Sequence, residues 1–237
     1  MKYAIYIFVL ITQISSASIV NGEEPDLAAS EIIHKLRENF SKIRDYTVDL
    51  HAIIEMEDVH IPPMDVKVFF KQPDKIFIKS DGFAMLPREG IIQNPAKFNE
   101  DNFYMDVLAV EMIDSAMTYK LELIPRTDES MARKIIIWVE PEKWVMKRLE
   151  SISWQGQKTV MKFDYQKVQN EFWLPSKTIA NLTLSGFTGL GGMMQMQQRN
   201  EIDSKKERKG TLIITFSDYD INSGLQDSLF EKREITY

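Results

Sequence analysis

The chain has 237 residues and 29 Lys and Arg against 35 Asp and Glu, which gives a formal net charge of −6. It therefore lacks the basic excess that a protein coating nucleic-acid phosphates needs. A hydrophobic content of 44% and a charged content of 27% are ordinary for a globular protein and exclude both global disorder and a polytopic membrane protein. The absence of cysteine excludes disulfides, thiolate metal sites, cysteine nucleophiles and an acylated N-terminal cysteine.

The first 22 residues predict a signal peptide. Lys2 supplies a positive start, residues 3–11 form an apolar core, and the small residues ending at Ala17 suit signal peptidase, with Gly22 as a second cleavage point. The alternatives are an uncleaved anchor or a buried first strand, but nine apolar residues are too few to span about 30 Å of hydrocarbon. We expect export, followed by a single mature domain over residues 23–237.

The mature chain opens with a predicted amphipathic helix. Pro25 suits its first turn, and the carboxylates of Asp26 and Glu31 favour the positive helix end. The apolar positions follow helical spacing and form one stripe: Ala29, Ile32, Ile33, Leu36, Phe40 and Ile43. This stripe requires a surface to pack against.

From Tyr46 to Met56 the apolar period changes from helical to two, with Ile53 as the exception. One apolar face and one polar face predict a half-buried antiparallel strand. Further strands are predicted over residues 66–70, 76–79, 102–112, 118–124, 134–140, 144–154, 158–168, 172–174, 176–184 and 211–216. About ten strands with short links predict an α+β fold, mainly an antiparallel meander, closed or curved.

A curved sheet with one dry face and one long helix has more apolar surface than the helix covers. A ligand or lid could fill the remainder, or the sheet could be a barrel packed with its own side chains, and the pattern leaves both open. Two irregular apolar segments favour a cavity: residues 82–87 (GFAMLP) and the Gly- and Met-rich residues 186–196. A crossover loop that contains methionine by chance is the alternative for the second segment.

Catalytic motifs are not evident in the sequence. His34, His51 and His60 lack the spacing of metal ligands, and Ser185 lacks the first glycine of a nucleophile elbow. The glycine-rich run after Ser185 has neither the Lys-Ser/Thr of a phosphate-binding loop nor a complete dinucleotide fingerprint. We expect no enzyme activity, no cofactor and no metal.

The order of several segments resembles the outer-membrane lipoprotein-sorting family, the LolA-like group. The segments are EIIHKL at 31–36, YTVDL at 46–50, FKQPDKI at 70–76, IWVEP at 137–141 before Trp144, and FSDYD at 216–220 leading to LFE at 229–231. The resemblance covers nearly the whole mature chain. It implies an unclosed β-barrel, or half-barrel, with a loop or helix lid over a hydrophobic cavity that holds acyl chains.

The resemblance and the strand pattern together predict a soluble periplasmic carrier of lipoproteins or lipids. We expect a monomer that contacts the membrane transiently, receives cargo from an inner-membrane donor and passes it to an outer-membrane acceptor protein. The predicted lid is Phe83, Met85 and Leu86, and each lining residue could instead be ordinary core under the helix. The predicted cavity lining is Val48, Leu50, Ile54, Met56, Val66, Val68, Phe70, Ile76 and Ile78.

One position departs from the family pattern. Carriers of the group have an arginine before the proline of the Lys-x-Pro turn, whereas this chain has Gln72 before Pro73. Any positive group for cargo transfer would then come from Lys71 or Lys75. The alternative function is a periplasmic sensor that binds a membrane-protein partner and responds to lipids; regulators of that kind add a C-terminal domain, and here the chain ends at Tyr237.

Overall fold

The computed structural model describes residues 26–56, 59–80, 94–128, 130, 132–184 and 208–231. The predicted signal peptide, the predicted lid residues Phe83, Met85 and Leu86, and residues 186–196 lie outside this part of the chain. Among the described residues, no helix has the length and apolar character needed to cross a membrane.

The molecule is one large antiparallel sheet with a long helix at one end. The elements are α1 (Ala29–Ser41), β1 (Asp45–Met56), β2 (Val59–His60), β3 (Met64–Lys71), β4 (Lys75–Ser80), the 3-10 helix η1 (Pro95–Lys97), β5 (Phe103–Ile113), β6 (Ala116–Pro125), β7 (Ala132–Glu140), β8 (Val145–Ser153), β9 (Lys158–Val168), β10 (Phe172–Leu184), β11 (Arg208–Ile221) and α4 (Ser228–Glu231).

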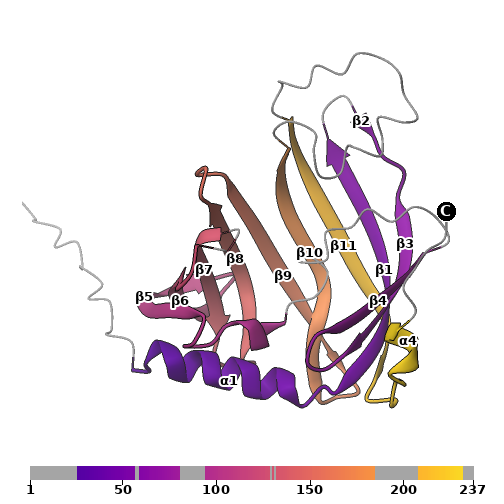
Figure 1. Cartoon of the computed structure of the whole chain (residues 1–237), viewed down its shortest axis with the longest axis horizontal. Coiled ribbons are helices and arrows are strands. Elements are labelled where there is room, and N and C mark those ends of the chain that lie inside the picture. The colour runs from indigo at the N-terminus through magenta and orange to yellow at the C-terminus, as the bar shows by residue number, and fades with distance from the viewer. Residues whose placement is uncertain are drawn as a thin grey trace, which may run out of the picture.

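The strands lie in the order β4-β3-β1-β11-β10-β9-β8-β7-β6-β5, with β2 beside β1. No pairing in the described chain joins the end strands β4 and β5, so the sheet is not closed. Figure 1 shows the sheet curving between these two ends, with α1 along its lower edge. The predicted half-barrel of about ten strands with an N-terminal helix is therefore confirmed.

The two end strands differ from ordinary exposed edges. In β5 the register shifts between Val107 and Ala109, so Leu108 forms a bulge opposite β6. β4 is six residues long and carries Lys75 and the exposed Lys79. Bulges, short strands and lysines are features that hinder the addition of a further strand to a sheet edge.

One predicted break in the sheet is wrong. Residues 172–174 and 176–184 were expected as separate strands divided by Pro175, but β10 runs through the proline. The register with β9 shifts between Pro175 and Lys177, which places the proline at a bulge, where its missing N–H costs no ladder hydrogen bond. The Pro175 carbonyl instead accepts a hydrogen bond from the Tyr219 hydroxyl at 2.9 Å.

The last strand is longer than predicted. Residues 211–216 were expected, whereas β11 spans Arg208–Ile221 and pairs with β1 as far as Tyr46 opposite Ile221. The polar residues after Phe216 hid this continuation, because Ser217, Asp218 and Asp220 are exposed and interrupt the apolar pattern. The short strand β2 was also not predicted.

The helix α1 begins later than predicted. Its buried residues are Ala29, Ile32, Ile33 and Leu36, which pack with Leu121, Ile137 and Met146 of the sheet. Asp26 was expected near the helix start but precedes it and accepts a hydrogen bond from the Tyr119 hydroxyl. Burial and this bond raise the pKa of Tyr119 to about 12.

On the outer face of the sheet, charged side chains cover one tryptophan. Trp138 is only 3% exposed, although it lies on this face. The Lys120 ammonium lies 5.1 Å from its ring centroid, the Arg148 guanidinium lies 4.7 Å away, and Glu111 accepts a hydrogen bond from its indole N–H. Long cationic stems thus cover the indole.

Hydrogen bonds from three polar side chains attach the C-terminal end of α1 to neighbouring parts of the chain. The Gln72 amide donates to the Phe40 carbonyl at 3.4 Å and to the Ile43 carbonyl at 3.1 Å. Asn222 donates to the Lys42 carbonyl, and Asn39 donates to the Lys143 carbonyl at 3.0 Å. Gln72, which departs from the family pattern, therefore joins the turn between β3 and β4 to the end of α1, where the Phe40 carbonyl also accepts a hydrogen bond from the Ile43 N–H at 3.1 Å.

Gln72→Met keeps the length of this side chain and removes both donated hydrogen bonds. We expect the free energy of unfolding to fall by about 1 to 2 kcal/mol and Tm by roughly 2 to 6 °C. Thermal melts followed by circular dichroism measure the change. Gln226→Met is the control, because Gln226 is exposed and its side chain has no hydrogen bond in the described structure. If both variants have the same Tm, the hydrogen bonds of Gln72 do not stabilise the protein.

Candidate functional site

The nine residues predicted to line a cavity lie in one hydrophobic cluster on the inner face of the sheet. Six of them, on β1 and β3, are buried: Val48, Leu50, Ile54, Val66, Val68 and Phe70. Met56, Ile76 and Ile78 are partly buried and pack against the same cluster. The register explains the arrangement, because Val48 lies opposite Val68, which in turn lies opposite Ile78.

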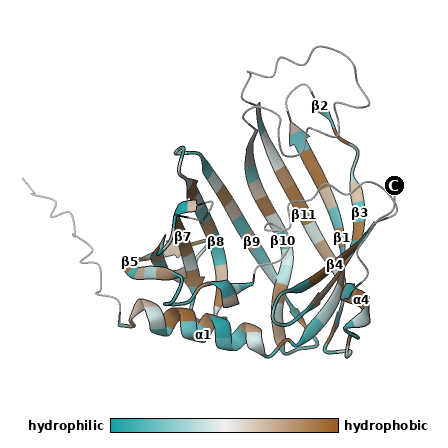
Figure 2. Cartoon of the chain, viewed as in Figure 1, coloured by the Kyte–Doolittle hydropathy of each residue, from teal (hydrophilic) through white to brown (hydrophobic). Residues whose placement is uncertain are grey.

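Strands β10 and β11 complete this cluster with residues that were not predicted as part of the lining. Leu212 lies opposite Ile54, Ile214 opposite Ala52, and Phe216 opposite Leu50. Figure 2 shows hydrophobic and hydrophilic positions alternating along these central strands. The apolar pattern of β11 was visible in the sequence, but its placement beside β1 was not, because that pairing joins distant parts of the chain.

A second hydrophobic cluster occupies the other half of the inner face, and α1 covers it. It contains Tyr119, Leu121, Leu123, Ile137, Val139 and Phe163 of the sheet. Ile32, Ile33 and Leu36 of α1 belong to this cluster, whereas Phe40 packs on the first one. The described helix therefore shields one half of the inner face far more than the half that carries the predicted lining.

A small aromatic pocket lies between the C-terminal half of α1 and the lower end of the sheet. Its cavity volume is about 50 Å³, room for roughly three to five water molecules and too little for a whole acyl chain. None of the nine predicted residues lines it. The wall contains Leu36, Asn39, Phe40, Ile43, Tyr46, Pro95, Trp144, Val145, Met146, Tyr165, Phe172, Trp173, Leu174, Pro175, Phe216 and Tyr219.

Three tyrosines give this pocket hydroxyl groups. The Tyr165 hydroxyl donates to the Met146 carbonyl at 2.8 Å, and the Tyr219 hydroxyl donates to the Pro175 carbonyl at 2.9 Å. Burial raises the pKa of Tyr46, Tyr165 and Tyr219 above the usual tyrosine range, so all three hydroxyls are neutral in ordinary buffers. Sequence analysis missed the pocket because its wall combines residues from α1, η1 and five strands or their turns.

The inner face also buries one hydroxyl without a partner. Thr178 is 1% exposed, lies between Ile214 and Phe163 across the sheet, and its Oγ1 makes no hydrogen bond in the described structure. A buried hydroxyl that has lost its water and gained no partner costs about 1 to 3 kcal/mol.

Thr178→Val replaces this hydroxyl with a methyl group of similar size. We expect unfolding to require about 1 kcal/mol more, because the variant buries no unpaired polar atom. Thr118→Val is the matched control, since Thr118 is equally buried but its hydroxyl donates to the Glu111 carbonyl at 2.7 Å. Chemical denaturation of both variants should show opposite signs; a loss of stability in both would contradict the assignment.

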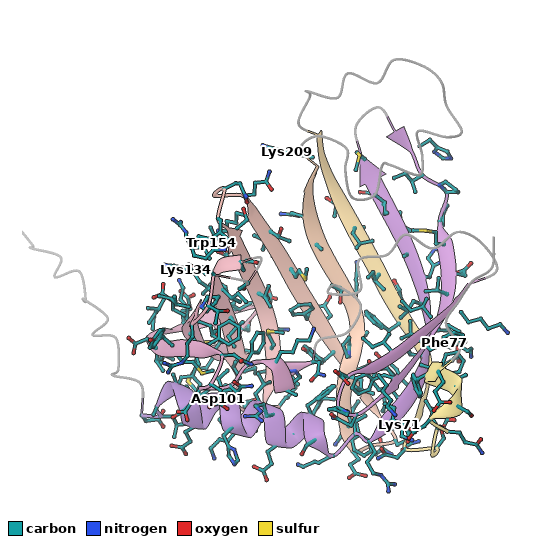
Figure 3. The ribbon with its side chains drawn as sticks, viewed as in Figure 1. Lys71, Phe77, Asp101, Lys134, Trp154 and Lys209 are labelled. Atoms are coloured by element: carbon teal, nitrogen blue, oxygen red, sulfur yellow. The ribbon has the colours of Figure 1, made fainter. Side chains whose placement is uncertain are left out.

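Lys71 and Lys75 are both engaged by Asp227 near the C-terminal helix α4. The Nζ–Oδ1 distances are 2.7 Å and 3.1 Å, and Lys71 also donates to the Leu225 carbonyl at 2.6 Å. Figure 3 shows Lys71 at the lower end of the sheet beside α4. Hydrogen bonds from Lys71 and Lys75 lower the pKa of Asp227 below its usual value of 3.8. The two lysines that could replace the family arginine therefore hold the C-terminal segment.

Asp227→Asn should lower Tm slightly at neutral pH, by an amount that shrinks as salt is added. Because the folded state lowers this pKa, the ionised carboxylate stabilises the protein above pH 3.8, and the stabilisation is lost as the pH falls through the lower, folded-state pKa. The difference between wild type and variant should vanish at low pH. Asp220→Asn, at an exposed aspartate without an ion pair in the described structure, is the control. A pH-independent difference would contradict this account.

No cluster of three or more acidic or histidine side chains suited to a metal ion occurs in the described part of the chain.

In sequence, no family model and no curated protein matches the chain. Solved structures match it in fold. A DUF1329 family protein from Desulfovibrio piger has a TM-score of 0.56 at 11% identity, with 86% of this chain and 98% of that chain covered.

Two further structures extend this likeness. A LolA superfamily protein from Nitrosomonas europaea has a TM-score of 0.54 at 14% identity, covering 87% of this chain and 98% of that chain. An outer-membrane lipoprotein-sorting protein domain from Vibrio parahaemolyticus has a TM-score of 0.50 at 13% identity, covering 85% and 97%. The resemblance noted in the sequence is confirmed at the level of structure: the chain has the fold of the LolA superfamily.

Proposed function

We propose that this protein is an exported carrier that binds the acyl chains of lipoproteins or lipids on the inner face of its sheet and delivers them toward the outer membrane. The observation that carries the proposal is the buried cluster that the nine predicted residues form in one half of an unclosed sheet, outside the half that α1 covers. Binding is by burial alone and requires no chemical step.

The driving force is the removal of hydrocarbon from water. Burial contributes about 0.8 kcal/mol per CH₂, so one chain of about sixteen carbons gains roughly 12 kcal/mol before the costs of ordering and of extraction from a membrane. Release into water is correspondingly unfavourable. A membrane or an acceptor protein must compete for the chains while the binding face opens.

Phe83, Met85 and Leu86 are the proposed lid over this face. Their segment joins two described anchors: β4 ends at Ser80 at one edge of the sheet, and η1 lies against α1. Asn94, just before η1, donates to the Pro73 carbonyl at 2.6 Å.

Export and the cellular partners are part of the same proposal and derive from the N-terminal sequence pattern and the fold. The signal peptide over residues 1–22 would send the mature chain to the periplasm as a monomer. An inner-membrane donor would load the protein, and an outer-membrane acceptor would unload it.

Native mass spectrometry of protein purified from the periplasm should show bound lipid or acylated peptide. Protein that carries no ligand in any preparation would contradict the carrier role.

Ile78→Gln and Lys79→Gln test the binding face with neighbouring residues on opposite faces of β4. Ile78 packs on the first cluster, whereas Lys79 is exposed. Loss of one buried aliphatic contact should weaken binding of a fluorescent fatty-acid probe by about tenfold in Ile78→Gln. Lys79→Gln should bind like wild type. Circular dichroism confirms that both variants fold, and unchanged affinity in Ile78→Gln would remove this residue from the site.

A further inference from the structure

We propose that the aromatic pocket beneath α1 is a polar subsite for the ester carbonyl of an acylated glycerol, with the Tyr46 hydroxyl as the hydrogen-bond donor. The inference rests on the proposed acyl-chain binding and specifies the class of lipid that the site takes.

Tyr46 offers the pocket an uncommitted donor. The residue is 6% exposed and lines the pocket, and within the described structure its hydroxyl has no hydrogen-bond partner. The other side-chain hydroxyls and the side-chain amide of the wall are in use: Tyr165 and Tyr219 donate to backbone carbonyls, and the Asn39 amide donates to the carbonyls of Lys143 and Trp144. A ligand with a neutral acceptor would therefore satisfy the one remaining hydroxyl.

The charge of the wall selects against a free fatty acid. None of the sixteen lining residues is a lysine, arginine or histidine. A carboxylate in this pocket would lose its water without contacting a positive group of the wall, because the ammonium groups of Lys35 and Lys143 lie outside the wall, 5.2 and 5.1 Å from the ring centroids of Trp144 and Trp173. Burying it there costs more than burying a neutral carbonyl. An ester presents the same acceptor oxygen without the charge.

The size of the cavity matches a functional group and not a chain. A volume of about 50 Å³ accommodates the few heavy atoms of an ester. The hydrocarbon would continue onto the first cluster, because Tyr46, Leu174 and Phe216 belong both to the pocket wall and to that cluster. The Tyr46 ring lies 5.0 Å from the ring of Phe70, one of the predicted lining residues.

The test compares dipalmitoylglycerol with its dihexadecyl ether analogue, which has the same chains but no carbonyl oxygen. Competition against a fluorescent acyl probe measures both affinities. We expect wild type to prefer the ester about three- to tenfold, the net effect of one hydrogen bond. Tyr46→Phe should bind both lipids equally, with its affinity for the ether unchanged. Palmitate at neutral pH should bind wild type more weakly than the ester.

Tyr219→Phe is the matched control. It removes a hydroxyl from the same wall, but one already donated to the Pro175 carbonyl, so the ester preference should persist. Equal affinity of wild type for ester and ether overturns the subsite while acyl-chain binding stands. Binding of neither lipid overturns the carrier function and the subsite together. Because the wild-type ratio is itself decisive, the test holds even if Tyr46→Phe fails to fold.

The ratio of the affinity for an ester to the affinity for its ether analogue also distinguishes two sources of the ester. Phosphatidylglycerol and an S-diacylglyceryl-cysteine peptide are each compared with their ether forms. An ester preference with the phospholipid alone identifies a lipid as cargo, and a preference with the peptide alone identifies a lipoprotein. A preference in neither pair overturns the subsite.

Discussion

The pairing of β1 with β11 is the contact on which the rest of the molecule depends. It joins the first long strand of the described chain to the last, from Tyr46 opposite Ile221 to Met56 opposite Gly210. Within the described sheet, β3 and β4 pair with the other long strands only through β1, so without this ladder no strand pairing would join the predicted lining to β10 and the helix-covered half. A pairing between such distant segments carries a high loop-closure cost, which the long ladder and its buried side chains offset.

The two faces of this sheet bury their apolar side chains in different ways. On the outer face, residues such as Lys120 and Arg148 cover Trp138 with their stems and pair with Glu111 and Glu150. On the inner face, aliphatic side chains meet across strands with no such polar cover. On this face α1 packs on the half formed by β6 to β9, whereas the other half is formed by β4, β3, β1, β11 and β10.

Much of the fold could be predicted because alternating burial leaves a direct trace in the sequence. The strand from Tyr46 to Met56 and the strand over residues 158–168 need only local information. Pro175 wrongly predicts the end of a strand, because proline is rare inside strands, and only the bulge beside Lys177 shows why this strand continues. Asp26 suited a helix start by composition, but its partner Tyr119 is distant in the chain.

The site could be predicted in part for the same reason. Its aliphatic half follows from period-two patterns on β1 and β3, whereas the aromatic pocket requires knowledge of which distant segments meet. Likewise, no local pattern shows that Gln72 holds the end of α1 or that Lys71 and Lys75 bind Asp227. The lysine contacts depend on the return of the C-terminal segment to the β3–β4 turn, and the Gln72 contacts depend on the position of that turn beside the end of α1.

An unclosed sheet also carries a hazard that a closed barrel avoids, because each free edge can recruit another chain and start aggregation. The bulge at Leu108 in β5 and the short, lysine-bearing β4 interrupt that recruitment at both ends. Such edges let a sheet stay unclosed without forming polymers through hydrogen bonds of its own backbone.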